Sequence, residues 1–266
     1  MPQDIDRIAK KLLECLGAGR SLARHPGLDM TAARAVAERV RELRERGGET
    51  PVGRKIGFTN TTIWQRYGVD GPMWNYVFDS TVRDLGDRVG TVSLQGFSEP
   101  RLEPEIAFGL SQAPDPSMDE GALFECIAWV APSFEIVQSV YPGWEFTAAE
   151  SAAAFGLHGA LLLGHRHDVS ADRGAWQASL SDFSATLVCD GRPIETGQAS
   201  NVLGGPLRAL AYLVREIAGD PTAQPLRPGE AITTGTLTDA QPLRPGQRWR
   251  TEFAGPPLAG PELVTR

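Results

Sequence analysis

The sequence predicts an α+β fold, in which a helical N-terminal cap (residues 1–50) precedes a mixed, β-rich body (residues 51–266). Three observations support this prediction. Apolar residues recur at helical spacing near the N-terminus, short β-branched and aromatic runs separated by Gly and Pro begin at about residue 51, and one helix interrupts these runs late in the chain. Helices and strands segregated along a chain in this way are typical of α+β architecture. We expect cap and body to form one continuous structural domain.

The cap is predicted to contain two helices. Residues 4–17 form an amphipathic pattern, and residues 31–46 form a second helix rich in Ala, Arg and Glu that stops before Gly47. Either Asp29 or Thr31 could cap this second helix, because both side chains can accept a hydrogen bond from the first free backbone N–H groups.

The body is predicted to be built from short strands. Apolar runs typical of strands include RKIGFT (54–59), EIAFGL (105–110), SATLVCDG (184–191) and RWRTEF (248–253). The late helix starts at Pro206 and is closed by Gly219, with apolar residues at helical spacing between them.

Composition narrows the class of protein. With 266 residues, 41% of them hydrophobic and 22% charged, the chain resembles average soluble globular proteins. A net charge of −7 argues against a nucleic-acid binder and fits a protein that handles small molecules or binds a cation. No apolar stretch is long enough to span a membrane, and the charged N-terminus differs from a signal peptide, so we expect a cytoplasmic protein. The widely spaced Cys15, Cys126 and Cys189 are expected to be buried thiols in a reducing compartment.

The stretch RLEPEIAFGL (101–110) contains the most informative charges. Glu103 and Glu105 are two residues apart, so in a strand both side chains point to the same face. Two like charges on a partly buried face are costly unless a positive group lies between them. Alternating glutamates on a solvated strand face are the simpler alternative.

Glu135, in the apolar run WVAPSFEIVQSV, is a third acidic candidate. A buried glutamate is rare unless it is paired or coordinates a metal. Three carboxylates without a neighbouring His or Cys would form an oxygen-only site, which suits Mg²⁺ or Mn²⁺ rather than Zn²⁺.

Several short motifs, in order and spacing, resemble the 2-keto-4-pentenoate hydratase family, which also includes 4-oxalocrotonate decarboxylases and belongs to the fumarylacetoacetate hydrolase-like superfamily. These motifs are RKIGFT at 54–59, EPEIAF at 103–108, PSFEIV at 132–137, GGPLRALAYLVREIAG at 204–219 and AITTGTLTDAQPLRPGQ at 231–247. The resemblance extends from about residue 35 to the end. It implies a body similar to the C-terminal fold of fumarylacetoacetate hydrolase.

The resemblance also implies one divalent cation, Mg²⁺ or Mn²⁺, held by Glu103, Glu105 and Glu135. Lys55 of the KIG motif would lie in the active site and move protons, and proximity to a cation together with desolvation would lower its pKa. The alternative for Lys55 is a surface lysine.

Gly235 and Thr236 would offer a backbone N–H and a hydroxyl to a substrate carboxylate. Asp79 could orient Lys55 or a water molecule as part of the catalytic machinery, or it could simply form a turn.

Residues 155–160, Phe-Gly-Leu-His-Gly-Ala, depart from the Asp-Asn-Ala-Ser-type run of many hydratases in this family. His158 could reach the distal end of the substrate as an acid, a base or a hydrogen-bond donor, or it could be satisfied by backbone groups in a turn. The aromatic segment 57–74 could form a pocket wall or a lid, or pack at a subunit interface.

The function implied by the resemblance is that of a lyase in aromatic catabolism. It would add water to a 2-hydroxy-2,4-dienoate, through its 2-oxo-3-enoate tautomer, to give a 4-hydroxy-2-oxo acid. The alternatives are decarboxylation of a 4-oxalocrotonate-like 2-oxo-dioate and a non-catalytic scaffold or partner protein. We expect a homo-oligomer that binds a small 2-oxo acid and neither nucleic acid nor membranes.

Overall fold

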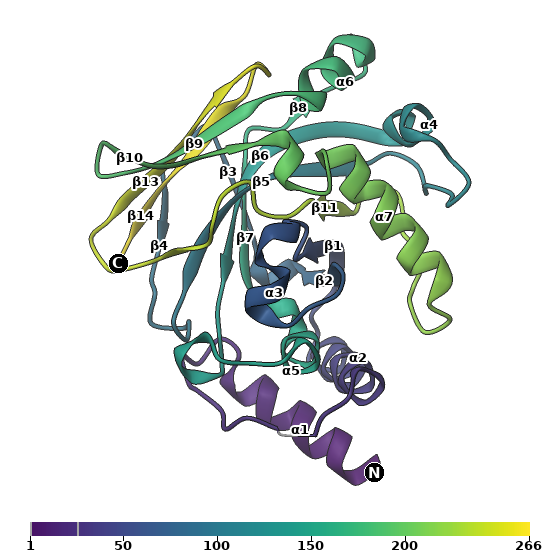
Figure 1. The fold of residues 1–266 in the computed structure, drawn as a ribbon, viewed down its shortest axis with the longest axis vertical. Coiled ribbons are helices and arrows are strands. Elements are labelled where there is room, and N and C mark those ends of the chain that lie inside the picture. Colours follow the sequence, from purple (N-terminus) through teal and green to yellow (C-terminus); the bar gives the residue numbers. More distant parts are fainter. Residues whose placement is uncertain (1, 26) are drawn as a thin grey trace.

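The computed structural model describes residues 2–25 and 27–266, which form helices at one end of the molecule and two packed sheets (Figure 1). Helices α1 (Pro2–Cys15) and α2 (Met30–Arg46) pack together, and α5 (Ala148–Ala153) packs against α2. Asp29 caps α2, because its Oδ1 accepts a hydrogen bond of 2.8 Å from Ala32 N. The predicted helices at 4–17 and 31–46 are therefore present with small shifts at their ends.

The larger sheet has the strand order β2-β1-β11-β5-β6-β7-β3. Its strands are β1 (Pro51–Gly57), β2 (Met73–Phe78), β3 (Val82–Gly86), β5 (Arg101–Leu110), β6 (Ile127–Val137), β7 (His158–Gly164) and β11 (Ala231–Thr233), with β8 (His167–Asp168) and β12 (Gln241–Pro242) paired to β6 and β5. The pairs β1–β11 and β3–β7 are parallel, and the other pairs are antiparallel, so the sheet is mixed.

The smaller sheet has the order β10-β9-β13-β14-β4. Its strands are β4 (Gly90–Val92), β9 (Ser184–Cys189), β10 (Arg192–Gln198), β13 (Arg248–Ala254) and β14 (Ala259–Thr265). An apolar cluster joins the two sheets and includes Leu102 and Phe134 of the larger sheet and Leu187 and Leu263 of the smaller one. Because side chains alternate along a strand, Glu103, Glu105 and Glu135 face away from this core.

Three helices cover the far end of the larger sheet: α4 (Glu120–Glu125), α6 (Arg173–Ser181) and α7 (Pro206–Gly219). Helix α7 coincides with the predicted late helix, and its Leu210 packs in one cluster with Phe108 and Val130 of the sheet. Cys15, Cys126 and Cys189 are buried free thiols, as expected. Within the described ranges, no helix has the length and apolarity needed to cross a membrane.

The short strand β11 sets the geometry of the sheet centre, because it lies between β1 and β5. Its backbone approaches β1 so closely that a Cβ at Gly53 would lie 2.0 Å from Ala231 O, which explains the glycine there. Thr233 is opposite both Lys55 of β1 and Ala107 of β5. The register therefore brings Lys55 to the same part of the sheet as the acidic residues of β5.

Candidate active site

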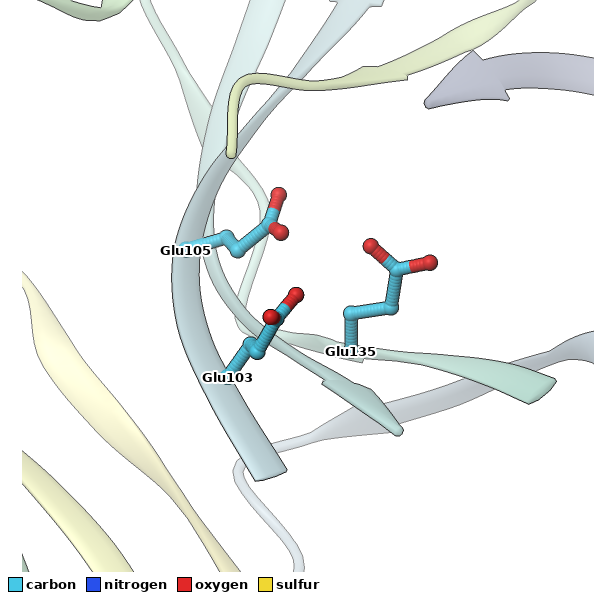
Figure 2. Close-up of side chains that lie close together, drawn as sticks. All are labelled: Glu103, Glu105 and Glu135. Atoms are coloured by element: carbon cyan, nitrogen blue, oxygen red, sulfur yellow. The ribbon is translucent and has the colours of Figure 1, made fainter. Parts of the chain in front are cut away.

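Three glutamates converge at the centre of the larger sheet (Figure 2). Glu103 and Glu105 come from β5, and Glu135 of β6 lies directly opposite Glu103 in the register. One carboxylate oxygen from each residue lies within 4.8 Å of the others. Glu105 and Glu135 are buried, and Glu103 is partly buried because it lines a cavity. The alternative of glutamates on a solvated strand face does not fit this burial.

Two of the carboxylates each present one oxygen that lacks a hydrogen-bond partner. Glu105 accepts a hydrogen bond of 2.9 Å at Oε2 from Gly235 N, and no described residue bonds to its Oε1. Glu135 is contacted at Oε1 by Lys55 and His158, whereas its Oε2 has no partner among the residues that the structure describes. Unpaired buried carboxylate oxygens are costly, and a divalent cation would satisfy them. An oxygen-only set of this kind fits Mg²⁺, Mn²⁺ or Ca²⁺.

The crowding of negative charge shifts the pKa values in opposite directions. Burial and the neighbouring Glu135 raise the pKa of Glu103 to about 7, although Lys55 opposes this effect. Burial and the two other carboxylates raise the pKa of Glu105 well above its usual range. Burial would also raise the pKa of Glu135, but Lys55 and His158 outweigh it and lower the pKa to about 2. Glu135 is therefore the member of the cluster that is ionised most readily.

Lys55 is buried on β1, and its ammonium group joins the cluster. Its Nζ lies 3.1 Å from Glu135 Oε1 and donates a hydrogen bond of 3.0 Å to Gly156 O. The surface-lysine alternative is therefore wrong. Among the protein's own charges, burial lowers the pKa of Lys55, but the three glutamates together raise it above its usual value. The lowered pKa expected beside a bound cation stays a prediction.

A cavity of about 300 Å³ opens beside the cluster. This volume lies at the lower end of the range of small-molecule pockets, ~300–1,000 Å³. Lys55 and Glu103 line it, and so do aromatic side chains, namely Phe58, Tyr67, Trp144 and Phe146. Part of the aromatic segment 57–74 therefore forms a pocket wall, as one of the sequence-based alternatives held. Arg101 also lines the cavity, and sequence reasoning missed it although it lies two residues before Glu103 in the same motif.

Comparisons with known proteins agree with this geometry. The chain is 30% identical to a 2-keto-4-pentenoate hydratase from Burkholderia vietnamiensis over 238 residues, which are 88% of this chain and 87% of that protein. The chain belongs to the 2-keto-4-pentenoate hydratase family. It is also 30% identical to a 4-oxalocrotonate decarboxylase from Pseudomonas sp over 239 residues, 89% of each chain. No model of a known protein family matches the chain.

The fold of this hydratase-family chain is similar to that of a solved 4-oxalocrotonate decarboxylase from Pseudomonas putida G7, which is complexed with magnesium and adipate. The TM-score is 0.89 at 21% identity, with 100% of this chain and 98% of that chain covered. The predicted α+β fold, with N-terminal helices and a body similar to fumarylacetoacetate hydrolase-like proteins, is confirmed.

His158, in the segment that departs from the family's usual run, does not line the cavity with Glu103. Its Nδ1 lies 2.7 Å from Glu135 Oε1, and its Nε2 lies 2.9 Å from Thr81 Oγ1. His158 instead lines a separate hollow of about 420 Å³, together with Arg44 and Thr81. His158 is therefore placed against Glu135 and not in the lining of this cavity, and its contact with the distal end of a substrate stays a prediction. Burial lowers the pKa of His158, although Glu135 opposes this effect.

Asp79 lies outside the site. It is exposed in the turn Asp79–Thr81, and its Oδ1 accepts hydrogen bonds from Thr50 N at 3.0 Å and Ser80 N at 2.8 Å. The predicted catalytic role is wrong, since these local bonds hold the carboxylate at the surface. The turn-forming alternative is correct.

Gly235 and Thr236 lie at the cluster, but their polar groups are already engaged. The Gly235 N–H holds Glu105, and the Thr236 hydroxyl donates a hydrogen bond of 2.7 Å to Thr238 O. Gly235 has φ +95°, and a Cβ there would lie 1.8 Å from Thr59 Oγ1, so only glycine fits. Thr236 lines the cavity, whereas the N–H of Gly235 positions a glutamate rather than facing a substrate.

Proposed function

We propose that the protein is a metal-dependent hydratase. It adds water to a 2-hydroxy-2,4-dienoate, through the 2-oxo-3-enoate tautomer, to give a 4-hydroxy-2-oxo acid. The observation that carries this proposal is the convergence of three glutamates, two of them with an unpaired buried oxygen, beside a buried lysine and an aromatic cavity. Membership of the hydratase family supports the same reaction.

We propose Mg²⁺ as the cofactor, with Mn²⁺ as a substitute, held by Glu103, Glu105 and Glu135. The unpaired Oε1 of Glu105 and Oε2 of Glu135 would each supply one ligand atom. Magnesium prefers such single carboxylate oxygens and leaves other positions to water or substrate. When bound, the cation would supply Lewis-acid stabilisation of negative charge on the substrate 2-oxygen.

Lys55 is the proposed proton carrier. In the first step its ammonium group gives a proton to C5 of the dienol and recovers one from the 2-hydroxyl group, which yields the 2-oxo-3-enoate. Water then adds across the remaining double bond, with its hydroxyl at C4 and its proton at C3. The contacts with Gly156 O and Glu135 support this role, because they fix the position of Nζ beside the cavity.

His158 is proposed as a positioning residue for Glu135. Nδ1–H donates to Glu135 Oε1, and Nε2 lies 2.9 Å from the Thr81 hydroxyl, which itself donates a hydrogen bond to Phe78 O. With Oε1 held in this way by His158 and Lys55, Oε2 of Glu135 stays directed toward the other two carboxylates. Hydrogen-bond partners of this kind orient metal ligands in many proteins.

Decarboxylation of a 4-oxalocrotonate-like 2-oxo-dioate is the second candidate. The 30% identity to a 4-oxalocrotonate decarboxylase favours it. A non-catalytic scaffold is not favoured, because converging buried carboxylates with unpaired oxygens would only destabilise such a protein.

Product analysis separates these functions. The protein is incubated with Mg²⁺ and, in turn, 2-hydroxypenta-2,4-dienoate, 2-hydroxyhexa-2,4-dienoate and 4-oxalocrotonate, and the products are followed by NMR. We expect a 4-hydroxy-2-oxo acid to appear, and turnover to stop with EDTA. Release of CO₂ from 4-oxalocrotonate without hydration of any dienoate would establish the decarboxylase instead.

We make three further proposals, on the domain organisation, the oligomeric state and the cellular location. Residues 1–50 and 51–266 form one continuous domain, which is supported by a shared apolar cluster containing Val36 of the cap and Phe78 and Tyr141 of the body. The protein assembles as a homo-oligomer and works in the cytoplasm. Light scattering and cell fractionation test the last two.

A further inference from the structure

Residues 234–240, here called the cavity loop, connect β11 to β12 and form part of the cavity wall. Both strands pair with β5, yet the loop stands opposite only residues 103–106, so its extra residues leave the ladder. The Gly235 N–H of this loop donates its hydrogen bond of 2.9 Å to Glu105 Oε2. The position of the loop therefore sets both a proposed cation ligand and a wall of the cavity. The members that line the cavity include Thr236, Thr238 and Asp239.

The cavity loop is held from outside by β10, the edge strand of the smaller sheet. Both carboxylate oxygens of Glu195 lie 3.1 Å from Asp239 N, which donates to them, and Oε2 also accepts a hydrogen bond of 3.1 Å from Gln241 Nε2. Gly197 lies two residues further along the same face of β10. A Cβ at Gly197 would lie 1.9 Å from Leu237 O, so the backbones of strand and loop are in direct contact.

The turn after β10 makes a second contact with the loop. Asn201 Nδ2 donates a hydrogen bond of 2.8 Å to Leu237 O. Two residues later, Leu203 N donates a hydrogen bond of 3.1 Å to the backbone oxygen of Thr59, which also lines the cavity. The segment that runs from β10 to this turn therefore supports the cavity lining at two places.

The first part of the cavity loop is fixed by β5 itself, because Thr234 N and Leu237 N donate to β5 carbonyls at 3.1 and 2.9 Å. Later in the loop, the backbone donor Asp239 N is directed to Glu195 instead. Removal of the Glu195 carboxylate would take away this acceptor and would also free the Gln241 amide. Hydrogen bonds of this kind preorganise a site, because they restrict the conformations open to its wall.

We propose that Glu195 and Asn201 are positioning residues of the active site. They hold the cavity loop in the conformation in which Gly235 N–H fixes Glu105 and the loop forms its part of the cavity wall. The smaller sheet thereby supports the cation site, although it supplies none of the three glutamates. This inference rests on the proposed function for the role of Glu105 as a ligand and of the cavity as the substrate site.

The variant Glu195→Ala tests the first contact. We expect the Kd for Mg²⁺, measured by calorimetry, to rise about threefold to tenfold, which is less than the ~10–100-fold cost of losing a direct partner of a metal ligand. The KM for 2-hydroxypenta-2,4-dienoate should rise by a similar factor, whereas kcat at saturating Mg²⁺ and substrate should stay within about twofold. In EDTA, the amide hydrogens of Gly235 and Asp239 should exchange at least about threefold faster, the effect of one lost hydrogen bond.

Two matched variants serve as controls. Glu195→Gln should remain within about twofold of the unchanged protein, because its amide oxygen can accept from Asp239 N and its NH₂ can donate to a rotated Gln241 side chain. Thr196 lies on the opposite face of β10, and its hydroxyl is 2.9 Å from the Thr186 hydroxyl of β9. Thr196→Val therefore removes a hydrogen bond of β10 without touching the cavity loop. It should change thermal unfolding alone and leave the Kd for Mg²⁺, the KM and the amide exchange of the loop as they were.

Asn201→Ala tests the second contact independently and extends the test to a variant in which Glu195 is kept. It should weaken Mg²⁺ binding and accelerate exchange at Gly235 in the same direction as Glu195→Ala. Thermal unfolding of each variant shows whether it is folded. Unfolding of both variants at the assay temperature would overturn the inference, because it would assign the two residues to the stability of the whole fold.

Three other results would overturn it. One is an unchanged Kd for Mg²⁺ and unchanged Gly235 exchange in both Glu195→Ala and Asn201→Ala. The second is an equal change in Thr196→Val, which would assign the effect to the stability of β10. The third is a fall in kcat at unchanged KM and Mg²⁺ affinity, which would place Glu195 in the reaction itself. If the unchanged protein binds Mg²⁺ but does not hydrate the dienoate, the proposed reaction fails, and Mg²⁺ affinity and amide exchange alone decide the inference.

Discussion

Two buried glutamates in this protein have opposite surroundings. Glu150, at the start of α5, accepts hydrogen bonds at both oxygens, from Arg24 Nη2 at 2.9 Å, His25 N at 2.7 Å and Thr147 N at 2.8 Å. Glu105 accepts one bond, from Gly235 N, and its Oε1 has no partner among the described residues. Burial raises the pKa of both, but at Glu150 the donors outweigh burial and lower it, whereas at Glu105 two further carboxylates raise it more.

The comparison teaches how to distinguish a structural acid from a ligand. A buried carboxylate with all its oxygens satisfied stabilises the fold around it, as Glu150 does in the capping box of α5. A buried carboxylate with an unpaired oxygen and like-charged neighbours destabilises the fold unless a cation binds. The same substitution at the two positions should therefore have opposite consequences.

Glu105→Gln gives the largest expected effect. Turnover should be abolished, and the Mg²⁺ affinity should fall by more than ~10², the upper range seen when only a partner of a metal ligand is removed. In EDTA the variant should be at least as stable as the unchanged protein, because repulsion with Glu103 and Glu135 is relieved. Calorimetric Mg²⁺ titration and thermal unfolding measure both quantities. Near-normal Mg²⁺ affinity would disprove the metal assignment.

Lys55→Ala tests the positive member of the same cluster. Turnover should fall by about 10² to 10⁴, the usual range for an acid–base group. The protein should still bind Mg²⁺, since all three glutamates remain. A loss of less than tenfold across the pH range would show that Lys55 serves the structure and not the reaction.

His158→Gln tests the support of Glu135 from behind. We expect the Mg²⁺ affinity to fall by ~10- to 100-fold, as for other residues that orient a metal ligand. Both the tautomerisation and the hydration should slow together at limiting Mg²⁺ and recover at high Mg²⁺. Loss of dienol absorbance and appearance of hydrated product follow the two steps. Selective slowing of hydration at saturating Mg²⁺ would instead indicate direct contact with the substrate.

Glu150→Gln should act on stability alone. The new amide NH₂ would face one of the backbone N–H groups of His25 or Thr147, so the free energy of unfolding should fall by ~1–3 kcal/mol. The pair with Arg24 adds little, because the Arg24 side chain is 47% exposed. Denaturant unfolding measures the loss, and Mg²⁺ affinity serves as the control that should not change. A lower Mg²⁺ affinity would mean that the two acidic regions are coupled.

The pH dependence of the stability should also differ in sign between Glu150 and Glu103. This is the smallest of the expected effects. The pKa of Glu150 is lowered by folding, so its contribution is present above about pH 4.5 and is lost as the pH falls through the folded pKa. The pKa of Glu103 is raised to about 7, so its contribution is lost as the pH rises from about 4.5 to 7. In EDTA, the stabilising effect of Glu103→Gln should therefore be larger at pH ~8 than at pH ~5.

Unfolding in denaturant at the two pH values measures this difference, with Glu150→Gln as the counterpart. The destabilisation caused by Glu150→Gln should shrink as the pH falls toward ~4. The same pH trend for both variants would contradict the contrast between the two regions.

The features that could be predicted from the sequence are local ones. The spacing of Glu103 and Glu105 indicated one strand face, and Asp29 stood where a helix cap was needed. The direction of His158 could not be predicted, because it depends on the pairing of β7 with β6, which places His158 opposite Val137. The position of the Asp79 side chain likewise depends on a hydrogen bond from Thr50, which is distant in the sequence and which no local pattern indicates.

The contacts around the glutamate cluster also depend on pairing between distant segments, which the sequence alone does not indicate. That Glu135 faces Glu103 follows from the register of two strands separated by a long loop and α4. The engagement of the Gly235 N–H by Glu105 follows from the turn after β11 and its φ of +95°. Arg101 was overlooked although the i, i+2 rule that grouped the glutamates applies to it equally.

The position of β11 has a consequence for how the protein is made. This three-residue strand comes late in the chain, yet it separates β1 from β5 at the sheet centre. During synthesis, β5 can pair with β6 early, whereas Lys55 and Gly235 reach the glutamates only after β11 has inserted. Closing such distant contacts is slow, so we expect folding in milliseconds to seconds or longer. Acquisition of cation binding would then mark a late event of folding, both on the ribosome and in refolding.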